Sequence, residues 1–152
     1  MTTSADMIAI ILIIICALLG AMLGFTRGIF GFAGIYMGAT YAAKNAADGN
    51  KYLTLLFGIF AGALVVGFLF YGSTRFTPME AMDPVFGAIL GFLIGWGACH
   101  GIFHYYVQYH PEAPFYAKIY DGKFAMDIHD IRPYQEMMNR TEGLRHPDPE
   151  RF

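Results

Sequence analysis

The chain alternates between long apolar stretches and short polar breaks over its first two-thirds. Residues 7–25 contain no Asp, Glu, Lys or Arg, and a helix of this length covers about 28 Å. The hydrocarbon core of a bilayer is about 30 Å thick, so this stretch is long enough for a transmembrane helix. Comparable stretches at residues 28–47, 52–71 and 84–106 predict three further helices. We therefore expect an all-α membrane protein, a compact bundle of about four transmembrane helices.

Polar residues mark where these helices begin and end. Asp6 precedes the first helix and Arg27 follows it, so the second helix must fold back tightly against the first. Asp83 can accept hydrogen bonds from the free N–H groups of the last apolar helix, and Pro84 suits its first position. The stretch at 28–47 is short for a perpendicular span, which leaves a re-entrant segment as an alternative.

The C-terminal tail, residues 107–152, has a different composition from the bundle at residues 1–106. It contains six basic and eight acidic residues and several prolines, which predicts a mostly irregular, polar segment outside the membrane. Only residues 133–140 have the pattern of a helix. The tail is also rich in aromatic residues, whereas disordered segments contain few. We therefore expect it to pack on a surface, either its own bundle or a partner.

Glycine recurs every four residues along the apolar helices, which places it on one stripe of each helix. Helices in a membrane associate where small residues let their backbones touch. The pattern therefore predicts close helix packing, either within the chain or between chains. The stepped glycines are Gly20, Gly24 and Gly28, Gly34 and Gly38, Gly58 and Gly62, Gly87, Gly91 and Gly95, and Gly97 and Gly101.

Composition excludes several classes of protein. Hydrophobic residues make up 56% of the chain and charged residues 14%, whereas soluble domains carry about 25% charged residues. The net charge of −2 offers no basic surface for nucleic acid. No charge lies in the middle of a predicted span, where pumps and transporters keep ionisable groups. The chain also lacks a catalytic triad motif and a phosphate-binding loop, so we expect no enzyme.

Histidines are the strongest candidates for chemistry. His100 and His104 lie one helical turn apart near the end of the last apolar helix, and such a pair can bind a metal, haem or chlorin. No third ligand is evident, so we favour interfacial histidines without a cofactor. In the tail, Asp127, His129 and Asp130 form an acid–imidazole cluster, which we interpret as solvated charge rather than as a zinc or general-base site.

Three motifs between residues 5 and 106 suggest a family. An aspartate, Asp6, opens the first helix within the sequence ADMI, and a Gly-x-x-Arg-Gly hairpin at 24–29 joins the first two helices. Asp83 then opens the glycine-stepped last helix. These motifs resemble the colicin V production protein family of bacterial inner-membrane proteins. The resemblance implies a small four-helix inner-membrane protein linked to export or envelope processes, with no defined enzymatic activity.

The leading hypothesis is a non-catalytic structural or accessory component of a larger membrane assembly. Its expected partners are the lipid bilayer and other membrane subunits, engaged through the glycine stripes and the tail. Arg27 can bind backbone carbonyls or lipid phosphates at the hairpin. The residues expected to matter structurally are Arg27, Asp83, Gly24, Gly28, Gly87, Gly91 and Gly95.

Two alternative functions stay open. The chain could be a cofactor-binding subunit of a respiratory or photosynthetic complex, using His100 or His104, or a small oligomeric channel or transporter.

If all four helices span, both termini lie on one face. The positive residues favour the cytoplasm for that face. The lysines on the terminal side are Lys44, Lys51, Lys118 and Lys123.

Overall fold

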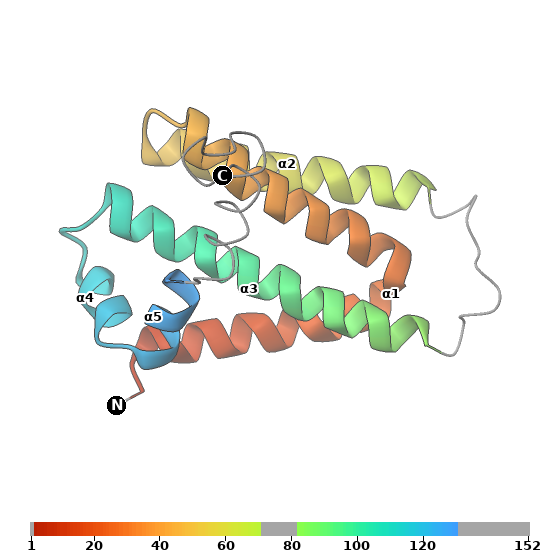
Figure 1. Ribbon diagram of the computed structural model, residues 1–152, viewed down its shortest axis with the longest axis horizontal. Helices are drawn as coiled ribbons and strands as arrows, with labels where there is room; N and C mark the ends of the chain where they lie inside the picture. The colour runs from red at the N-terminus through yellow and green to blue at the C-terminus, as the bar shows by residue number, and fades with distance from the viewer. Residues whose placement is uncertain (1, 71–81, 131–152) are drawn as a thin grey trace, which may run out of the picture.

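A computed structural model describes residues 2–70 and 82–130, and every regular element in these ranges is a helix. Three of the helices are long and apolar enough to cross a membrane, which agrees with the predicted helical membrane protein. Figure 1 shows the long helices side by side along the long axis of the molecule. In chain order the helices are α1 (Ser4–Asn45), α2 (Gly49–Phe70), α3 (Asp83–Tyr109), α4 (Pro114–Tyr120) and α5 (Lys123–His129).

A sharp bend at Gly24 divides α1 into two halves, residues 4–23 and 25–45. The φ of Gly24 is 80°, a left-handed conformation that glycine adopts without a Cβ clash. The predicted connection at 26–27 is absent, because Thr26 and Arg27 already lie in the helix that follows the bend. The change of direction therefore takes place at a single glycine.

Contacts with α3 show that the two halves of α1 run in opposite directions. In the first half, earlier residues contact later parts of α3, so this half is antiparallel to α3. In the second half, later residues contact later parts of α3, so this half is parallel to it. The contacts of the first half are Gly20 with Gly87 and Ile13 with Gly95, and those of the second half are Gly28 with Leu90, Gly31 with Ile94 and Ile35 with Gly97.

Glycine lets the first half of α1 and α3 approach to backbone contact. A methyl group added to Gly95 would lie 2.8 Å from Ile13 Cα, and one added to Gly91 would lie 3.0 Å from Ala17 Cα. The sequence leaves open whether such stripes pack within the chain or between chains, and here they pack within it. Gly58 and Gly62 differ, because no atom lies within 4 Å of a methyl group added to either.

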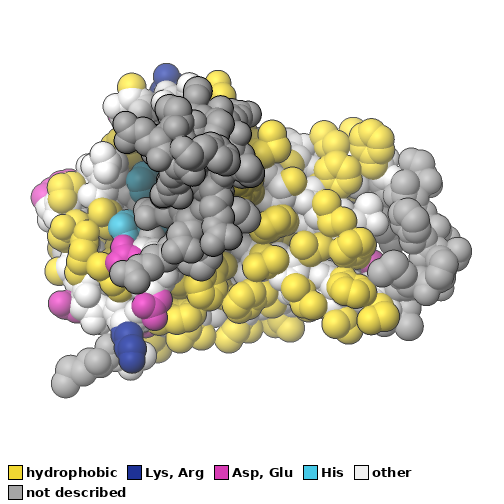
Figure 2. All heavy atoms as spheres, in the orientation of Figure 1, with side chains coloured by type: hydrophobic (Ala, Val, Ile, Leu, Met, Phe, Trp, Pro, Cys, Tyr) yellow, Lys and Arg dark blue, Asp and Glu magenta, His cyan; other side chains and the backbone are white. Residues whose placement is uncertain are grey.

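The long helices expose an apolar surface and bury a small core. Met22 in α1 and Leu69 in α2 are 81% and 75% exposed, which suits contact with lipid tails. Figure 2 shows hydrophobic side chains over much of the visible face, with the visible histidines and most of the visible charged side chains at one end. One buried cluster lies between α1, α3 and the two short helices: Ala5, Ala9, Ile13, Cys99, Phe103, Ile119, Ala125 and Ile128.

The first part of the tail contains two short helices, so the prediction of a mostly irregular segment is wrong for residues 114–120 and 123–129. Pro114 occupies the first position of α4, where its missing N–H is not needed, and it therefore starts a helix. Gly122 is the N-cap residue of α5. The helix predicted at 133–140 lies outside the described residues.

Candidate functional site

The start of α1 contains a carboxylate that is almost completely buried. Asp6 is 1% exposed, and its Oδ2 accepts the backbone N–H of Thr3 at 2.9 Å while the Thr3 hydroxyl accepts the N–H of Asp6 at 3.3 Å. This reciprocal pair is a capping box. The other oxygen, Oδ1, accepts the N–H of Ala125 in the first turn of α5 at 2.7 Å. One carboxylate therefore caps two helices that are far apart in the sequence.

The same junction fixes α4. The Thr3 hydroxyl donates a hydrogen bond to the carbonyl of Lys118 at 2.9 Å. Gly122 leaves the space this junction needs, since a Cβ there would lie 2.6 Å from Thr3 Oγ1 and 2.8 Å from Asp6 Oδ1. The predicted packing of the tail on a surface is thus satisfied, for α4 and α5, by the chain's own bundle.

A cluster of three imidazoles forms where α5 packs on α3. Nδ1 of His100 lies 3.1 Å from the carbonyl oxygen of Ile128. The ring centroid of His100 is 6.3 Å from that of His104 and 6.3 Å from that of His129. The side chain of His129 is 17% exposed, so the interpretation of the 127–130 cluster as solvated charge does not fit this residue.

The rings of the histidine cluster stand further apart than two imidazoles bound to one metal ion. Two imidazoles on one tetrahedral metal have ring centroids about 5 Å apart, given metal–nitrogen distances of about 2.1 Å. Separations of 6.3 Å are wider than this. In residues 2–70 and 82–130, no group of three or more His, Cys, Asp and Glu could hold a metal ion. A metal, haem or chlorin bound through His100 or His104 stays a prediction.

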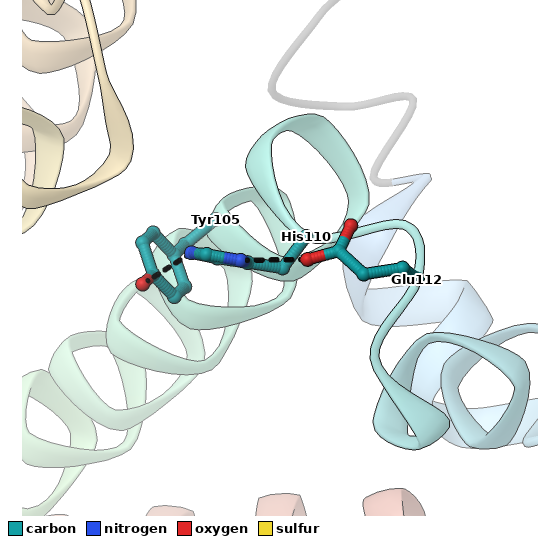
Figure 3. A network of polar contacts seen from close by, with 3 residues as sticks. All are labelled: Tyr105, His110 and Glu112. Carbon is teal, nitrogen blue, oxygen red and sulfur yellow. Dashed lines mark hydrogen bonds and ion pairs between the residues drawn. The ribbon is translucent and has the colours of Figure 1, made fainter.

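A second polar network closes the C-terminal end of α3 (Figure 3). The hydroxyl of Tyr105 lies 2.7 Å from Nε2 of His110, and Nδ1 of His110 lies 3.1 Å from a carboxylate oxygen of Glu112. Hydrogen bonds from its own backbone N–H and from His110 lower the pKa of the Glu112 carboxyl. The side chains of His110 and Glu112 are 41% and 72% exposed, so water competes for these contacts. The network therefore closes the exposed end of α3.

The Asp83 side chain binds the backbone at the bend of α1. The sequence predicts instead that it caps its own helix, α3. The N-cap residue of α3 is Met82, whose side chain makes no capping hydrogen bond. The Asp83 carboxylate instead accepts the backbone N–H of Phe25 at 2.8 Å. The bend interrupts the helical hydrogen bonds of α1, so the N–H groups after Gly24 need acceptors from elsewhere. A carboxylate from α3 supplies one of them.

The other predicted structural residues surround this junction. A methyl group on Gly24 would lie 3.0 Å from the carboxyl carbon of Asp83, and one on Gly28 would lie 3.0 Å from Leu90. The guanidinium of Arg27 stacks over the ring of Phe68 in α2, 4.3 Å from its centroid, in a cation–π contact. Arg27 therefore links the second half of α1 to the end of α2.

Two features of the polar end are absent from the sequence-based predictions. Thr3 and Asp6 have the spacing of a capping box, a local signal for the first role of Asp6. Its second role, binding Ala125, joins residues 119 positions apart and leaves no local signal. The approach of His129 to His100 is equally non-local.

No model of a known protein family, no curated protein and no solved structure matches this chain. The resemblance to the colicin V production protein family thus stays a prediction, and the residues and their contacts alone carry the functional argument.

Proposed function

We propose that this chain is a non-catalytic membrane protein that serves as a structural or accessory component of a larger membrane assembly. It resembles the colicin V production protein family, and we place it in the bacterial inner membrane. Its partners are other membrane subunits.

The uncovered face of α2 is the observation that carries this proposal. Gly58 and Gly62 have the four-residue step of the packed glycines, but nothing lies within 4 Å of a methyl group on either. Ala61 on the same face is also exposed. A helix with this pattern in a bilayer can receive a second helix at backbone distance. In the described residues, the stepped glycines of α1 and α3 already pack within the chain, against each other or against α2, whereas Gly58 and Gly62 of α2 stay uncovered.

We further propose four passes across the membrane, with each half of α1 crossing separately. Each half has about 20 residues and spans about 30 Å, enough for the hydrocarbon core. The start of α1 and the tail helices meet at one end, as the bond between Thr3 and Lys118 requires. The α1–α2 connection lies at this end too, since Gly49 contacts Tyr105 and Tyr109. The lysines in these segments favour the cytoplasmic side for both termini.

The test is purification of the full-length chain in a gentle detergent, with mass spectrometry of the proteins that accompany it. We compare the wild type with the double substitution Gly58→Ile and Gly62→Ile, which fills the α2 stripe. A substitution at Leu69→Ile, on the same helix and exposed to lipid, is the matched control. The proposal expects stoichiometric partner subunits with the wild type and control, and their loss with the double variant. A wild type that purifies alone, or a double variant that keeps every partner, refutes it.

The two alternatives have separate tests. A Soret or chlorin band in the visible spectrum of the purified protein would favour a cofactor-binding subunit. Ion flux into liposomes above that of empty liposomes would favour a channel or transporter.

A further inference from the structure

The C-terminal end of α3 brings a phenol, an imidazole and a carboxylate into one hydrogen-bonded row. The helix ends at Tyr109, and the backbone of His110 leaves the helical conformation with φ −137° and ψ 54°. The His110 ring folds back along the helix and lies between the Tyr105 hydroxyl, at 2.7 Å, and the Glu112 carboxylate, at 3.1 Å (Figure 3). The row therefore has the order of a weak acid, a base and a carboxylate that orients the base.

The direction of these hydrogen bonds follows from the chemistry of the carboxylate. An ionised carboxylate has no proton to donate, so Glu112 accepts from the Nδ1–H of His110. A neutral imidazole with its proton on Nδ1 presents the lone pair of Nε2 as an acceptor. The Tyr105 hydroxyl therefore donates to Nε2, and His110 is placed to take up the phenol proton.

The Tyr105 ring lies among other aromatic rings. It is half-buried, and its centroid is 5.3 Å from that of Tyr106 and 6.2 Å from that of Tyr109. A Cβ at Gly49, the first residue of α2, would lie 2.6 Å from its Cε2, so glycine allows this contact. The ring of Tyr52 in α2 is 5.8 Å from that of Tyr109. Four phenols thus lie close together at this end of the molecule.

A proton acceptor distinguishes Tyr105 from the other three phenols. Of the four, only its hydroxyl lies at hydrogen-bond distance from an imidazole in the described part of the chain. Loss of an electron makes a phenol strongly acidic, so oxidation is easiest where a positioned base takes up the proton. An electron removed from this group of phenols should therefore come from Tyr105.

The oxidant that suits this arrangement takes an electron and no proton. The phenol hydrogen is already bonded to His110, so a radical that abstracts a hydrogen atom would first have to break this bond. An oxidised metal centre accepts an electron alone and needs no contact with the hydroxyl. The side chains of His110 and Glu112 are 41% and 72% exposed, so such a centre on a neighbouring molecule can approach this end of α3.

We propose that Tyr105 is a redox-active tyrosine, which gives one electron to an oxidised metal centre of a neighbouring molecule while its phenol proton moves to Nε2 of His110. The step turns the phenol into a neutral tyrosyl radical and the imidazole into an imidazolium, and it lowers the charge of the metal centre by one. Glu112 is a positioning residue, because its carboxylate fixes the tautomer of His110. This role does not depend on the accessory function proposed above.

Flash oxidation of the full-length protein in lipid nanodiscs tests the proposal. A flash converts tris(bipyridine)ruthenium(II) into the ruthenium(III) oxidant, with a cobalt(III) ammine as the electron acceptor, at mildly alkaline pH. A nitroso spin trap captures the radical, and mass spectrometry locates the adduct. We expect more adduct on Tyr105 than on Tyr52, Tyr106 or Tyr109. In samples frozen without the trap, the radical should have the low gx value of a phenoxyl oxygen that accepts a hydrogen bond.

Three substitutions separate proton transfer from other causes. His110→Gln removes the proton acceptor and should lower the adduct on Tyr105 at least about tenfold, since a positioned base contributes about 10²–10⁴-fold. His104→Gln is the matched control, because it removes an imidazole of the same helix whose ring packs against Tyr52. It should behave as the wild type. Glu112→Gln keeps an oxygen that accepts from Nδ1–H, so the adduct should fall less than in His110→Gln.

Several results would overturn the proposal. An even spread of adduct over the four phenols in the wild type does so, as does an unchanged adduct on Tyr105 in His110→Gln or an equal fall in His104→Gln. A wild-type radical with the gx value of a phenoxyl without a hydrogen bond also overturns it. The gx value decides alone if hydrogen exchange shows that His110→Gln unfolds the end of α3, because it is measured on the unaltered chain.

Discussion

Substituting alanine for glycine at two positions of this chain should have opposite effects on stability. Gly91 and Gly58 both lie inside helices, so alanine gains about 1 kcal/mol of helix propensity at either position. At Gly58 the added methyl group meets no atom within 4 Å. The Gly58→Ala variant should therefore be as stable as the wild type or up to about 1 kcal/mol more stable.

At Gly91 the added methyl group meets backbone. It overlaps the carbonyl oxygen of Cys16 and lies 3.0 Å from Ala17 Cα, so the two helices must separate. Overpacking of this kind costs about 1–3 kcal/mol, and rigid backbone on the other side favours the upper end. After subtraction of the propensity gain, Gly91→Ala should be destabilised by about 2 kcal/mol, about 3 kcal/mol below Gly58→Ala.

Thermal unfolding in detergent, followed by circular dichroism at 222 nm, measures the difference. For a chain of this size about 1 kcal/mol shifts Tm by about 2–4 °C, so the two variants should differ by about 6–12 °C. Equal Tm values for Gly91→Ala and Gly58→Ala would refute the contact of α1 with α3 through the glycine stripe.

Three further substitutions test the junctions. Asp83→Ala removes the acceptor of the Phe25 amide and should destabilise the protein by about 1–2 kcal/mol in thermal unfolding, whereas Asp83→Asn, which keeps an oxygen acceptor, should lose less. Asp6→Ala leaves the Ala125 amide without its acceptor, so its hydrogen exchange should accelerate about 10–100-fold, and an unchanged rate would exclude the shared cap. Phe124→Ala removes a ring that packs edge-on against the single tryptophan, so tryptophan emission should shift to the red; identical spectra would contradict docking of α5.

The sequence predicts the long helices because each is specified by local information. Apolar runs of about 20 residues between polar breaks locate α2 and α3 to within a few residues, at Gly49–Phe70 and Asp83–Tyr109. The sequence-based prediction places the turn between the two halves of α1 at residues 26–27. The reason is that a turn in water needs a polar loop, and these two polar residues suggest one. In this chain Gly24 supplies the left-handed backbone and α3 supplies the acceptor, so no loop is required.

The junctions are harder to predict because their partners are distant in sequence. Asp6 indicates the start of a helix, but nothing near it predicts that it also caps α5. The prolines of the tail suggest irregular structure, yet Pro114 begins a helix whose burial depends on contact with α1 and α3. The histidines are visible in the sequence as a pair on one helix. Only the fold brings the third imidazole to them.

The partly buried carboxylate junction at Asp83 explains why the glycine stripes of α1 and α3 meet in register. The hydrogen bond from Phe25 to Asp83 fixes the start of α3 against the bend of α1. From that point the helices run antiparallel, and each step of four residues brings the next glycine of α3 against the next turn of α1, so Gly87 meets Gly20 and Gly95 meets Ile13. A shift by one residue would break the bond to Asp83 and turn the glycines away from the interface. Among lipid tails, burial of leucine adds little to the association of helices. The polar contact at Asp83 therefore sets the register, and the glycines allow the close packing.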